Sequence, residues 1–282
     1  MNQQKICIIG DGLASLTTAA ILSNENINID IYTGIKKINK IIDSRTTAIS
    51  ESNYKYIKDN LHLTKDSFFW SCKEINLFFE HEKKIINFLN FDEKKKNYMY
   101  IFQNKYLKKK LENIIKLKKN IKLINKNIEN IDSKGNSIVL KKKNIFYDLI
   151  ILSTGSSSNL YSEIEEGRSI KKNYEEFAIT SIIKHKAQIK NACQFFLKEG
   201  PLAILPLKKE LFSVVWSVNK KFFTTHKKNL KKILTTKLKT LLKLKKIEIV
   251  NNIKFFPINL NLKTKYFKKN ILILGDGLHS IH

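Results

Sequence analysis

The tetrapeptide GDGL occurs twice in the chain, at Gly10–Leu13 and at Gly275–Leu278. Each copy directly follows a short apolar run, ICII in the first case and ILIL in the second. A glycine at a strand end lets the chain turn tightly and lets a phosphate approach the backbone. The N-terminus of a following helix then attracts negative charge. Gly10-x-Gly12 therefore predicts a turn that binds the pyrophosphate of a dinucleotide.

The elements around the first copy support this interpretation. Residues 5–10 contain the continuous apolar run ICII, typical of a strand buried on both faces of a parallel sheet. Residues 10–23 turn into a helix, and residues 27–33 form a second, β-branched strand. This order predicts half of a dinucleotide-binding fold. Ser15 stands at the third glycine position and is expected to space helix and strand apart. The alternative is a glycine turn in an unrelated α/β protein.

The acid that should bind the ribose is less clearly marked. Such folds carry a carboxylate about twenty residues after the glycines, where it binds the ribose hydroxyls. Asp30 lies at about this distance but inside the second strand, which ends at Thr33. Asp30 is therefore either the ribose-binding acid or a half-exposed strand residue.

The remaining patterns place parallel α/β material on both sides of an antiparallel insertion. Residues 146–155 and 270–277 each contain a buried strand followed by glycine. Between them, residues 177–218 hold three β-rich runs that predict an antiparallel sheet with one covered face. Residues 230–242 predict an amphipathic helix whose apolar stripe lies on a core.

The segment between the first two predicted strands and the antiparallel insertion contains three further predicted elements. Residues 45–61 read as a loop entering a helix. Residues 103–118 predict a helix with one apolar face. Residues 127–141 contain two strand-like pieces joined by DSKGN, which predicts a hairpin.

The composition favours a globular chain, and its charge does not point to a nucleic-acid partner. The net charge is +27, but all except two of the 52 basic residues are lysines, spread through every segment. A surface that reads phosphates usually clusters arginine, so we expect no nucleic-acid partner. Contact with an anionic membrane surface stays open.

Several other function classes lack their signatures. Cys7, Cys72 and Cys193 form no C-x-x-C pair, which argues against a disulfide framework or a zinc site and favours a reducing cytosol. The six histidines form no HExxH pattern, and the chain has no G-x-S-x-G elbow. We expect no metal site, no secretory signal and no membrane span, and any chemistry has to come from a bound cofactor.

Five stretches together resemble the FAD-dependent aromatic hydroxylases. They are ICIIGDGLASLTTAAIL, DSRTTAISESNYKYI, YDLIILSTGSSSNL, GPLAILPLKKELFSVVW and ILILGDGLHSIH, in the order and approximate spacing of that family. The branch that looks most similar is the ubiquinone-biosynthesis hydroxylases, which resemble para-hydroxybenzoate hydroxylase in fold.

The resemblance implies an α/β chain with two discontinuous domains. A Rossmann-like FAD-binding domain with a parallel sheet would comprise residues 1–66, 100–160 and 266–282. An antiparallel-sheet substrate domain would interrupt it at residues 67–99 and 161–265.

The resemblance also implies roles for single residues. Arg45 matches an arginine that contacts the cofactor phosphates, and Gln103 matches a polar residue beside the flavin. The alternatives are a surface-loop cation and a helix-terminal polar residue. Asp276 matches an aspartate that binds the ribityl chain. The predicted cofactor-binding residues are Gly10, Gly12, Leu13, Ala14, Ser15, Thr33, Arg45, Gln103, Gly155, Gly275 and Asp276. Pro206 and Trp216 are predicted to line the substrate pocket, although Pro206 equally fits an edge-strand or turn proline.

The implied activity is that of an FAD-dependent monooxygenase. It would use NAD(P)H and O2 to hydroxylate a small aromatic or prenylated phenol in ubiquinone biosynthesis. The resemblance names no catalytic side chain in this sequence. We expect a cytoplasmic location, or one peripheral to the inner membrane or in contact with a biosynthetic complex.

The chain departs from the family in ways that keep two alternatives open. Thr33 and Thr154 replace expected acids, and the chain ends at His282, where family members continue into a helix beside the flavin. We therefore expect a chain shortened at its C-terminus, or one completed by a second polypeptide. The alternatives are a non-catalytic remnant or accessory subunit, and an FAD-dependent oxidoreductase without oxygenase activity.

Overall fold

The chain packs into two compact units, each built from separate stretches of sequence. The computed structural model describes residues 3–35, 45–63, 68–82, 84–92, 96–132, 136–155, 159–161, 169–187 and 189–280. The first unit comprises Met1–Ile42, Lys105–Asn173 and Asn259–His282, and the second comprises Asp43–Asn104 and Tyr174–Ile258. These units are defined by packing alone. The domain boundaries implied by the family resemblance stay a prediction.

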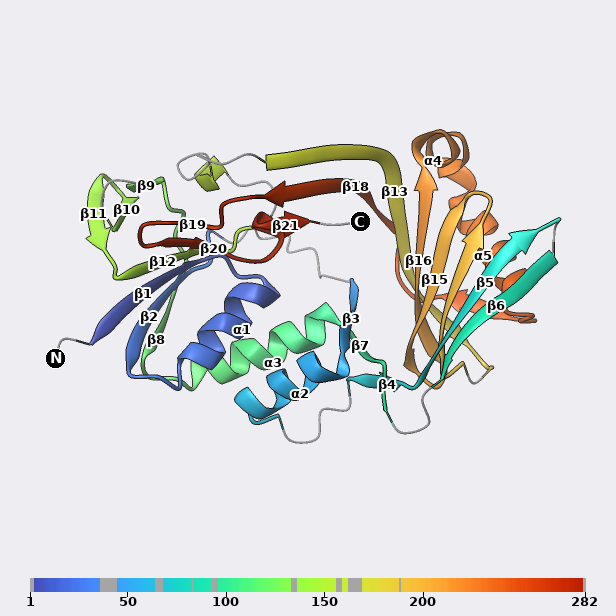
Figure 1. Cartoon of the computed structure of the whole chain (residues 1–282), viewed down its shortest axis with the longest axis horizontal. Helices are drawn as coiled ribbons and strands as arrows, with labels where there is room; N and C mark the ends of the chain where they lie inside the picture. Colours follow the sequence, from blue (N-terminus) through green and yellow to red (C-terminus); the bar gives the residue numbers. More distant parts are fainter. Residues whose placement is uncertain are drawn as a thin grey trace. The chain divides into compact units, whose positions relative to one another are not determined.

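A six-stranded, mostly parallel sheet forms the centre of the first unit (Figure 1). Its order is β19 (Phe267–Lys268), β20 (Ile271–Ile273), β12 (Leu149–Leu152), β1 (Gln4–Ile9), β2 (Ile27–Tyr32) and β8 (Ile121–Ile124). All neighbouring strands are parallel except β19 and β20. The predicted parallel strands are therefore confirmed. Their continuous apolar runs are explained by cover on both faces of the sheet.

Two helices lie on one side of this sheet and a small sheet on the other (Figure 1). The helices are α1 (Leu13–Leu22) and α3 (Asn104–Lys116). The small antiparallel sheet consists of β9 (Asn130–Asp132), β10 (Ser137–Leu140) and β11 (Lys143–Phe146). Ile131 and Ile138 of this sheet share a hydrophobic cluster with Cys7 and Ile9 of β1. The predicted helix at 103–118 and the predicted hairpin at 127–141 are confirmed, and β11 is an addition to them.

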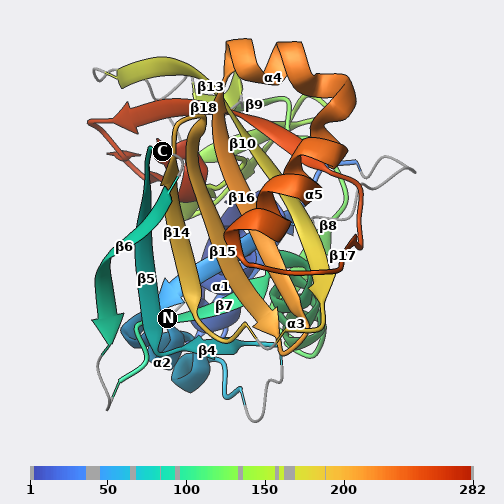
Figure 2. The ribbon, with the colours of Figure 1, turned by 90° about the vertical axis from the view of Figure 1, so that its right-hand side faces the viewer.

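The second unit is built on an antiparallel sheet whose one face is covered by helices (Figure 2). Its strands follow the order β13 (Ser169–His185), β16 (Leu211–Asn219), β15 (Gly200–Lys208), β14 (Ala192–Leu197), β5 (Glu74–His81) and β6 (Lys84–Asp92). β17 (Ile247–Ile249) pairs with β13, and β14 runs parallel to β5. The covering helices are α4 (Lys220–His226) and α5 (Leu230–Leu241). Leu234 and Leu238 of α5 are fully buried against Val214 and Trp216, which confirms the predicted helix and its apolar stripe.

A second, smaller layer lies within the same unit. It is the antiparallel sheet of β3 (Thr46–Ser50), β7 (Met99–Gln103) and β4 (Trp70–Cys72), with α2 (Glu51–Asn60) following β3. Cys72 and Ile101 of this layer form a buried cluster with Ile182, Ala192 and Leu207 of the larger sheet. The sequence prediction of a loop at the start of residues 45–61 is wrong, because Thr46–Ser50 pairs with β7 as a strand.

Within the described residues, no helix is both long enough and apolar enough to cross a membrane.

Candidate functional site

The first GDGL segment forms the turn between β1 and α1, as its glycines predict. Gly10 has a φ of +127°, and a Cβ on this residue would overlap the carbonyl oxygen of Ser153 at the end of β12. Its amide donates to the carbonyl of Tyr32 at 2.9 Å, which ties the turn to the end of β2. Only glycine fits this position, because both its backbone angle and its surroundings exclude a side chain.

The N-terminus of α1 is open in the way a phosphate-binding helix requires. Gly12 caps the helix in an extended conformation without a side-chain hydrogen bond, and the first turn holds no acidic residue. A Cβ on Gly12 would meet nothing within 4 Å, so the backbone is accessible from outside. The first-turn amides, from Leu13 to Ser15, have no acceptor within the helix itself, because these amides precede the first intrahelical bond. They can therefore bind an anion.

The second GDGL segment packs directly against the first. Gly275, Asp276 and Gly277 form one short 3-10 turn after β20, and Gly275 has a φ of +69°. A Cβ on Gly275 would lie 3.1 Å from the Cβ of Ala14 and 3.5 Å from Oγ of Ser153. The amide of Leu274 donates to the carbonyl of Leu152 at 2.8 Å, which holds the turn at the carboxyl end of the sheet. The two segments therefore line one edge of the first unit.

The Ser15 side chain makes a contact that the sequence did not predict. Its side chain is fully buried, and Oγ donates a hydrogen bond to the carbonyl oxygen of Ser153 at 3.2 Å. The hydroxyl thus joins the helix to the end of β12. The sequence prediction that Ser15 only spaces helix and strand apart misses this bond.

Tyr161 is a residue near this edge that the sequence reasoning missed. Its hydroxyl packs on Gly277, where a Cβ would overlap it. The same hydroxyl accepts hydrogen bonds from Oγ1 of Thr154 at 3.0 Å and from the amide of Thr154 at 3.3 Å. Burial raises the pKa of Tyr161. Thr154, which replaces the acid expected before Gly155, therefore anchors a tyrosine, and no local pattern around residue 161 signals this contact.

Gly155 and Asp276 complete the described residues at this edge. Gly155 has a φ of +81°, and a Cβ there would meet nothing within 4 Å. Asp276 is exposed, so its carboxylate is available to a ligand.

Asp30 is occupied inside the first unit. Its carboxylate pairs with Nζ of Lys5 at 3.0 Å and accepts a hydrogen bond from the hydroxyl of Tyr147 at 2.8 Å. The hydroxyls of Tyr147 and Tyr32 are 3.0 Å apart, and burial raises the pKa of both groups. Of the two alternatives, the strand-residue interpretation fits these contacts, although Asp30 is buried and not half-exposed.

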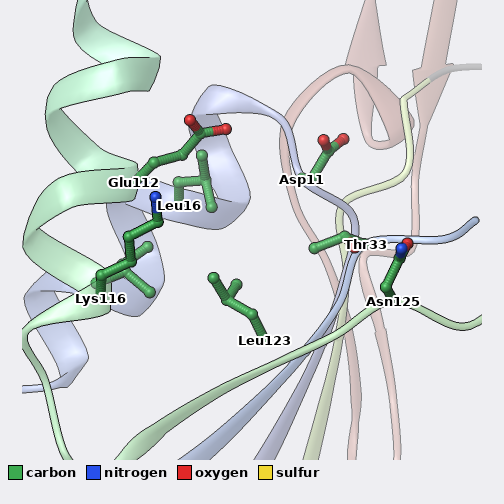
Figure 3. Close-up of a pocket in the computed structure, with 8 residues that line it drawn as sticks. Asp11, Leu16, Thr33, Glu112, Lys116, Leu123 and Asn125 are labelled. Carbon is green, nitrogen blue, oxygen red and sulfur yellow. The ribbon is translucent and has the colours of Figure 1, made fainter. Parts of the chain in front are cut away.

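Thr33 lines a pocket at the carboxyl ends of β2 and β8 (Figure 3). The pocket has a volume of about 170 Å³. Its walls are formed by Asp11, Leu16, Thr33, Glu112, Ile115, Lys116, Leu123 and Asn125. Nζ of Lys108 lies 2.9 Å from the Asp11 carboxylate, which links the glycine turn to α3. The pocket therefore joins the glycine turn, the second strand and one face of α3.

Arg45 and Gln103 lie close together in the second unit. Gln103 is the last residue of β7 and pairs with Thr46 of β3. Its placement corrects the prediction that it opens a helix, since α3 begins at Asn104. The carbonyl of Arg45 accepts a hydrogen bond from the amide of Asn104 at 3.0 Å. The cofactor contacts of both residues stay predictions.

Pro206 and Trp216, predicted to line a substrate pocket, are both buried in the second unit. Trp216 is fully buried in the core beneath the helices, with its ring centroid 5.4 Å from that of Phe222 in α4. Pro206 pairs with Phe212, another core residue. These contacts give the pocket assignment no support. The pocket assignment rests on the family resemblance and stays a prediction.

Among the described residues, no group of histidines, cysteines and carboxylates could hold a metal ion.

Comparisons with known proteins give a likeness in structure alone. No protein-family model matches the chain, and no curated protein matches it by sequence. Among solved structures, 2-methyl-3-hydroxypyridine-5-carboxylic acid oxygenase matches with a TM-score of 0.73 at 12% identity, over 99% of this chain and 76% of its own. PqsL of Pseudomonas aeruginosa, described as a probable FAD-dependent monooxygenase, matches with a TM-score of 0.79 at 11% identity, over 100% and 80%. p-Nitrophenol 4-monooxygenase PnpA of Pseudomonas putida matches with a TM-score of 0.76 at 11% identity, over 99% and 73%. The chain therefore shares one fold with these oxygenases over essentially its whole length.

Proposed function

We propose that the protein is an FAD-dependent monooxygenase that hydroxylates an aromatic ring, with NAD(P)H and O2 as co-substrates. One observation carries the proposal. The two GDGL segments lie next to each other at the carboxyl end of a parallel sheet, beside a helix N-terminus that has no side-chain cap. Dinucleotides bind at this place in open α/β sheets. The shared fold with oxygenases, one of them described as FAD-dependent, supports the same conclusion.

The residues present fit the pyrophosphate of FAD. Gly12 leaves open space above the turn, and the first-turn amides of α1 offer donors and partial positive charge to an anion. These amides would hold the pyrophosphate, and Arg45 is the cation expected to neutralise it. The chain's strong positive charge would further attract the doubly charged ligand.

The second GDGL segment fits the flavin half of the same ligand. Asp276 is exposed on the turn that packs against Ala14, so its carboxylate would accept hydrogen bonds from ribityl hydroxyls. When bound, the flavin supplies the redox chemistry, and the protein's own residues bind, orient and exclude water. This proposal agrees with a sequence that has no HExxH and no G-x-S-x-G pattern.

The aromatic substrate would contact the face of the second unit's sheet that lies opposite α4 and α5, part of which packs against the small layer of β3, β4 and β7. Alternate residues of a strand point to opposite faces, and Trp216 points toward α4 and α5. Its neighbours Val215 and Ser217 therefore lie on the other face, as does Ala203, which pairs with Val215. We propose this face, and not Pro206 and Trp216, as the wall that meets the ring. A prenylated phenol of ubiquinone biosynthesis is the substrate that the sequence resemblance favours.

One observation favours a second candidate, a non-catalytic protein that retains the fold. Tyr161 packs on Gly277 and thereby covers the backbone of the second GDGL segment at that residue. This is the backbone that the flavin half would approach. A chain of this kind would bind FAD weakly or not at all.

The two candidates are separated by spectroscopy and turnover on the purified chain. After incubation with FAD and removal of free ligand, bound flavin absorbance is the expected result. NAD(P)H oxidation with a hydroxylated phenol in the product mixture would then support the monooxygenase. Bound flavin with NAD(P)H oxidation but an unaltered phenol would favour an oxidoreductase without oxygenase activity. Absence of bound flavin would favour the non-catalytic candidate.

A further inference from the structure

The pocket beside Thr33 lies where the ribose of an adenosine would be expected. Thr33 directly follows β2, and the amide of Thr33 donates to the carbonyl of Ile124 at 3.0 Å, between the ends of β2 and β8. A dinucleotide whose pyrophosphate lies on α1 directs its adenosine toward the end of the second strand. The two hydroxyls of the ribose are best bound there by a carboxylate, which accepts hydrogen bonds from both.

Neither Asp30 in β2 nor the residue after the strand, Thr33, offers this carboxylate. Thr33 is uncharged, and its hydroxyl lies 3.4 Å from the carbonyl of Gly34. Asp30 is buried, and its carboxylate is already bonded to Lys5 and Tyr147. The acceptor for the ribose therefore has to come from another element.

Two carboxylates line the pocket, and their surroundings differ. Asp11 is neutralised by Lys108, whose Nζ lies 2.9 Å from its carboxylate. Glu112 is half-buried one helical turn further along α3, and the described part of the chain offers it no ion pair or hydrogen bond. Figure 3 shows the Glu112 carboxylate beside Leu16, on the wall opposite Thr33. Among the described residues, Glu112 is thus a half-buried carboxylate without an ion-pair or hydrogen-bond partner, although Lys116 lines the same pocket.

We propose that Glu112 binds the ribose hydroxyls of the adenosine half of FAD, in place of the strand-end acid that Thr33 lacks. The proposal rests on the proposed function, since it presumes that FAD is the ligand. Leu16 and Leu123 supply an apolar wall, and the Asp11–Lys108 pair fixes α3 beside the glycine turn so that Glu112 faces the pocket. The cost of burying a lone carboxylate is offset only when a donor reaches it.

The test is FAD affinity, measured by the change in flavin fluorescence on binding, for the wild-type chain and Glu112→Gln. Because FAD is an anion, loss of a negative charge by general electrostatics would tighten binding. Loss of a hydrogen-bonded carboxylate would weaken it by about 10- to 100-fold. The matched control is Glu25→Gln, the same charge change on an exposed residue before β2. β2 separates Glu25 from the pocket by about 20 Å.

Two further measurements tie the effect to the ribose. The 2′-deoxyadenosine analogue of FAD should bind the wild-type chain more weakly than FAD does. On the Glu112→Gln variant, the analogue and FAD should bind with equal affinity. The double variant Thr33→Glu/Glu112→Gln, which returns the acid to the strand end, should recover most of the lost affinity. Both results depend on binding and not on turnover.

The outcomes distinguish a failure of the proposed function from a failure of the inference about Glu112. If the wild-type chain does not bind FAD, both the proposed function and the inference about Glu112 fail. If the wild-type chain binds FAD but Glu112→Gln behaves like Glu25→Gln, the inference about Glu112 fails and the proposed function stands.

Discussion

Asp30 is predicted to stabilise the first unit without binding the cofactor, and substitutions at this position can separate the two roles. Its carboxylate accepts a hydrogen bond from Tyr147 at 2.8 Å and pairs with Nζ of Lys5 at 3.0 Å. The side chain of Asp30 is 9% exposed, whereas that of Lys5 is 43% exposed. Asp30→Asn keeps the shape and an acceptor oxygen, and Asp30→Ala removes both bonds.

The expected loss of stability follows from these exposures. A hydrogen bond to a charged acceptor contributes about 1.5–3 kcal/mol when it is buried. The pair with Lys5 adds less than about 1 kcal/mol, because the lysine is well solvated. We therefore expect Asp30→Ala to lower the free energy of unfolding of the first unit by about 2–3 kcal/mol, and Asp30→Asn by about half as much.

Amide hydrogen exchange measured on peptides from β1 and β2 is the suitable assay, since it reports the first unit directly. Exchange in Asp30→Ala should be about 30- to 150-fold faster than in the wild-type chain, and Glu25→Gln should leave it unchanged. FAD affinity of Asp30→Asn should stay within about twofold of wild type. Unchanged exchange together with weaker FAD binding would refute the argument and identify Asp30 as the ribose-binding acid.

Four further predictions test the packing and charge of the chain. Trp216→Ala should lower the free energy of unfolding by about 3–5 kcal/mol, because it leaves a cavity in the core. Denaturant titrations followed by circular dichroism measure this loss, and a higher KM for the substrate at wild-type stability would contradict it. Burial lowers the pKa of His185 below 6.5, so the unfolded chain takes up a proton at higher pH than the folded chain. Stability should therefore fall as the pH drops below about 6.5, and His185→Gln should reduce this slope in thermal melts. Ser15→Ala should cost about 1 kcal/mol through loss of the bond to Ser153, whereas Gly10→Ala should prevent folding of the first unit, as soluble expression would show. If the net charge of +27 brings the chain to membranes, it should co-sediment with anionic vesicles and not with neutral ones, and equal binding to both would exclude a charge-driven contact.

The backbone of the nucleotide edge could be predicted from the sequence because its signals are local. Glycine at positions 10 and 275 follows an apolar run in each case, and both residues adopt positive φ angles at strand ends. The buried strands likewise follow from their continuous apolar runs. Helices α1, α3 and α5 follow from the spacing of their buried residues, since each helix buries one stripe. The adjacency of the two GDGL segments required the resemblance to a known family, because nothing in either segment specifies a partner at the far end of the chain.

The side chains at this edge could not be predicted, because their partners lie on other elements. Ser15 is bonded to Ser153, and Thr154 to Tyr161, through contacts that no spacing rule describes. Strands β6 and β7 were also missed. β6 is an edge strand with most residues exposed, so it lacks the alternating pattern that marks a half-buried strand. β7 is a short strand in the middle of the small sheet, and its partners β3 and β4 come from separate segments of the chain.

The proposed ribose-binding acid illustrates how a ligand contact can be kept although the residue that the sequence motif specifies has changed. A carboxylate at the end of the second strand is a local solution, and a sequence pattern can detect it because its distance from the glycines is fixed. A carboxylate on α3 reaches the same space because the buried residues Leu107, Leu111 and Ile115 pack that helix in the first unit. The ion pair of Lys108 and Asp11 adds a contact between the helix and the glycine turn. The distance of this carboxylate along the chain is then set by the length of the intervening segments, and no spacing rule can find it. Loss of the strand-end acid at Thr33 is therefore not by itself evidence for loss of the ligand, and binding measurements on Glu112 variants decide between the two.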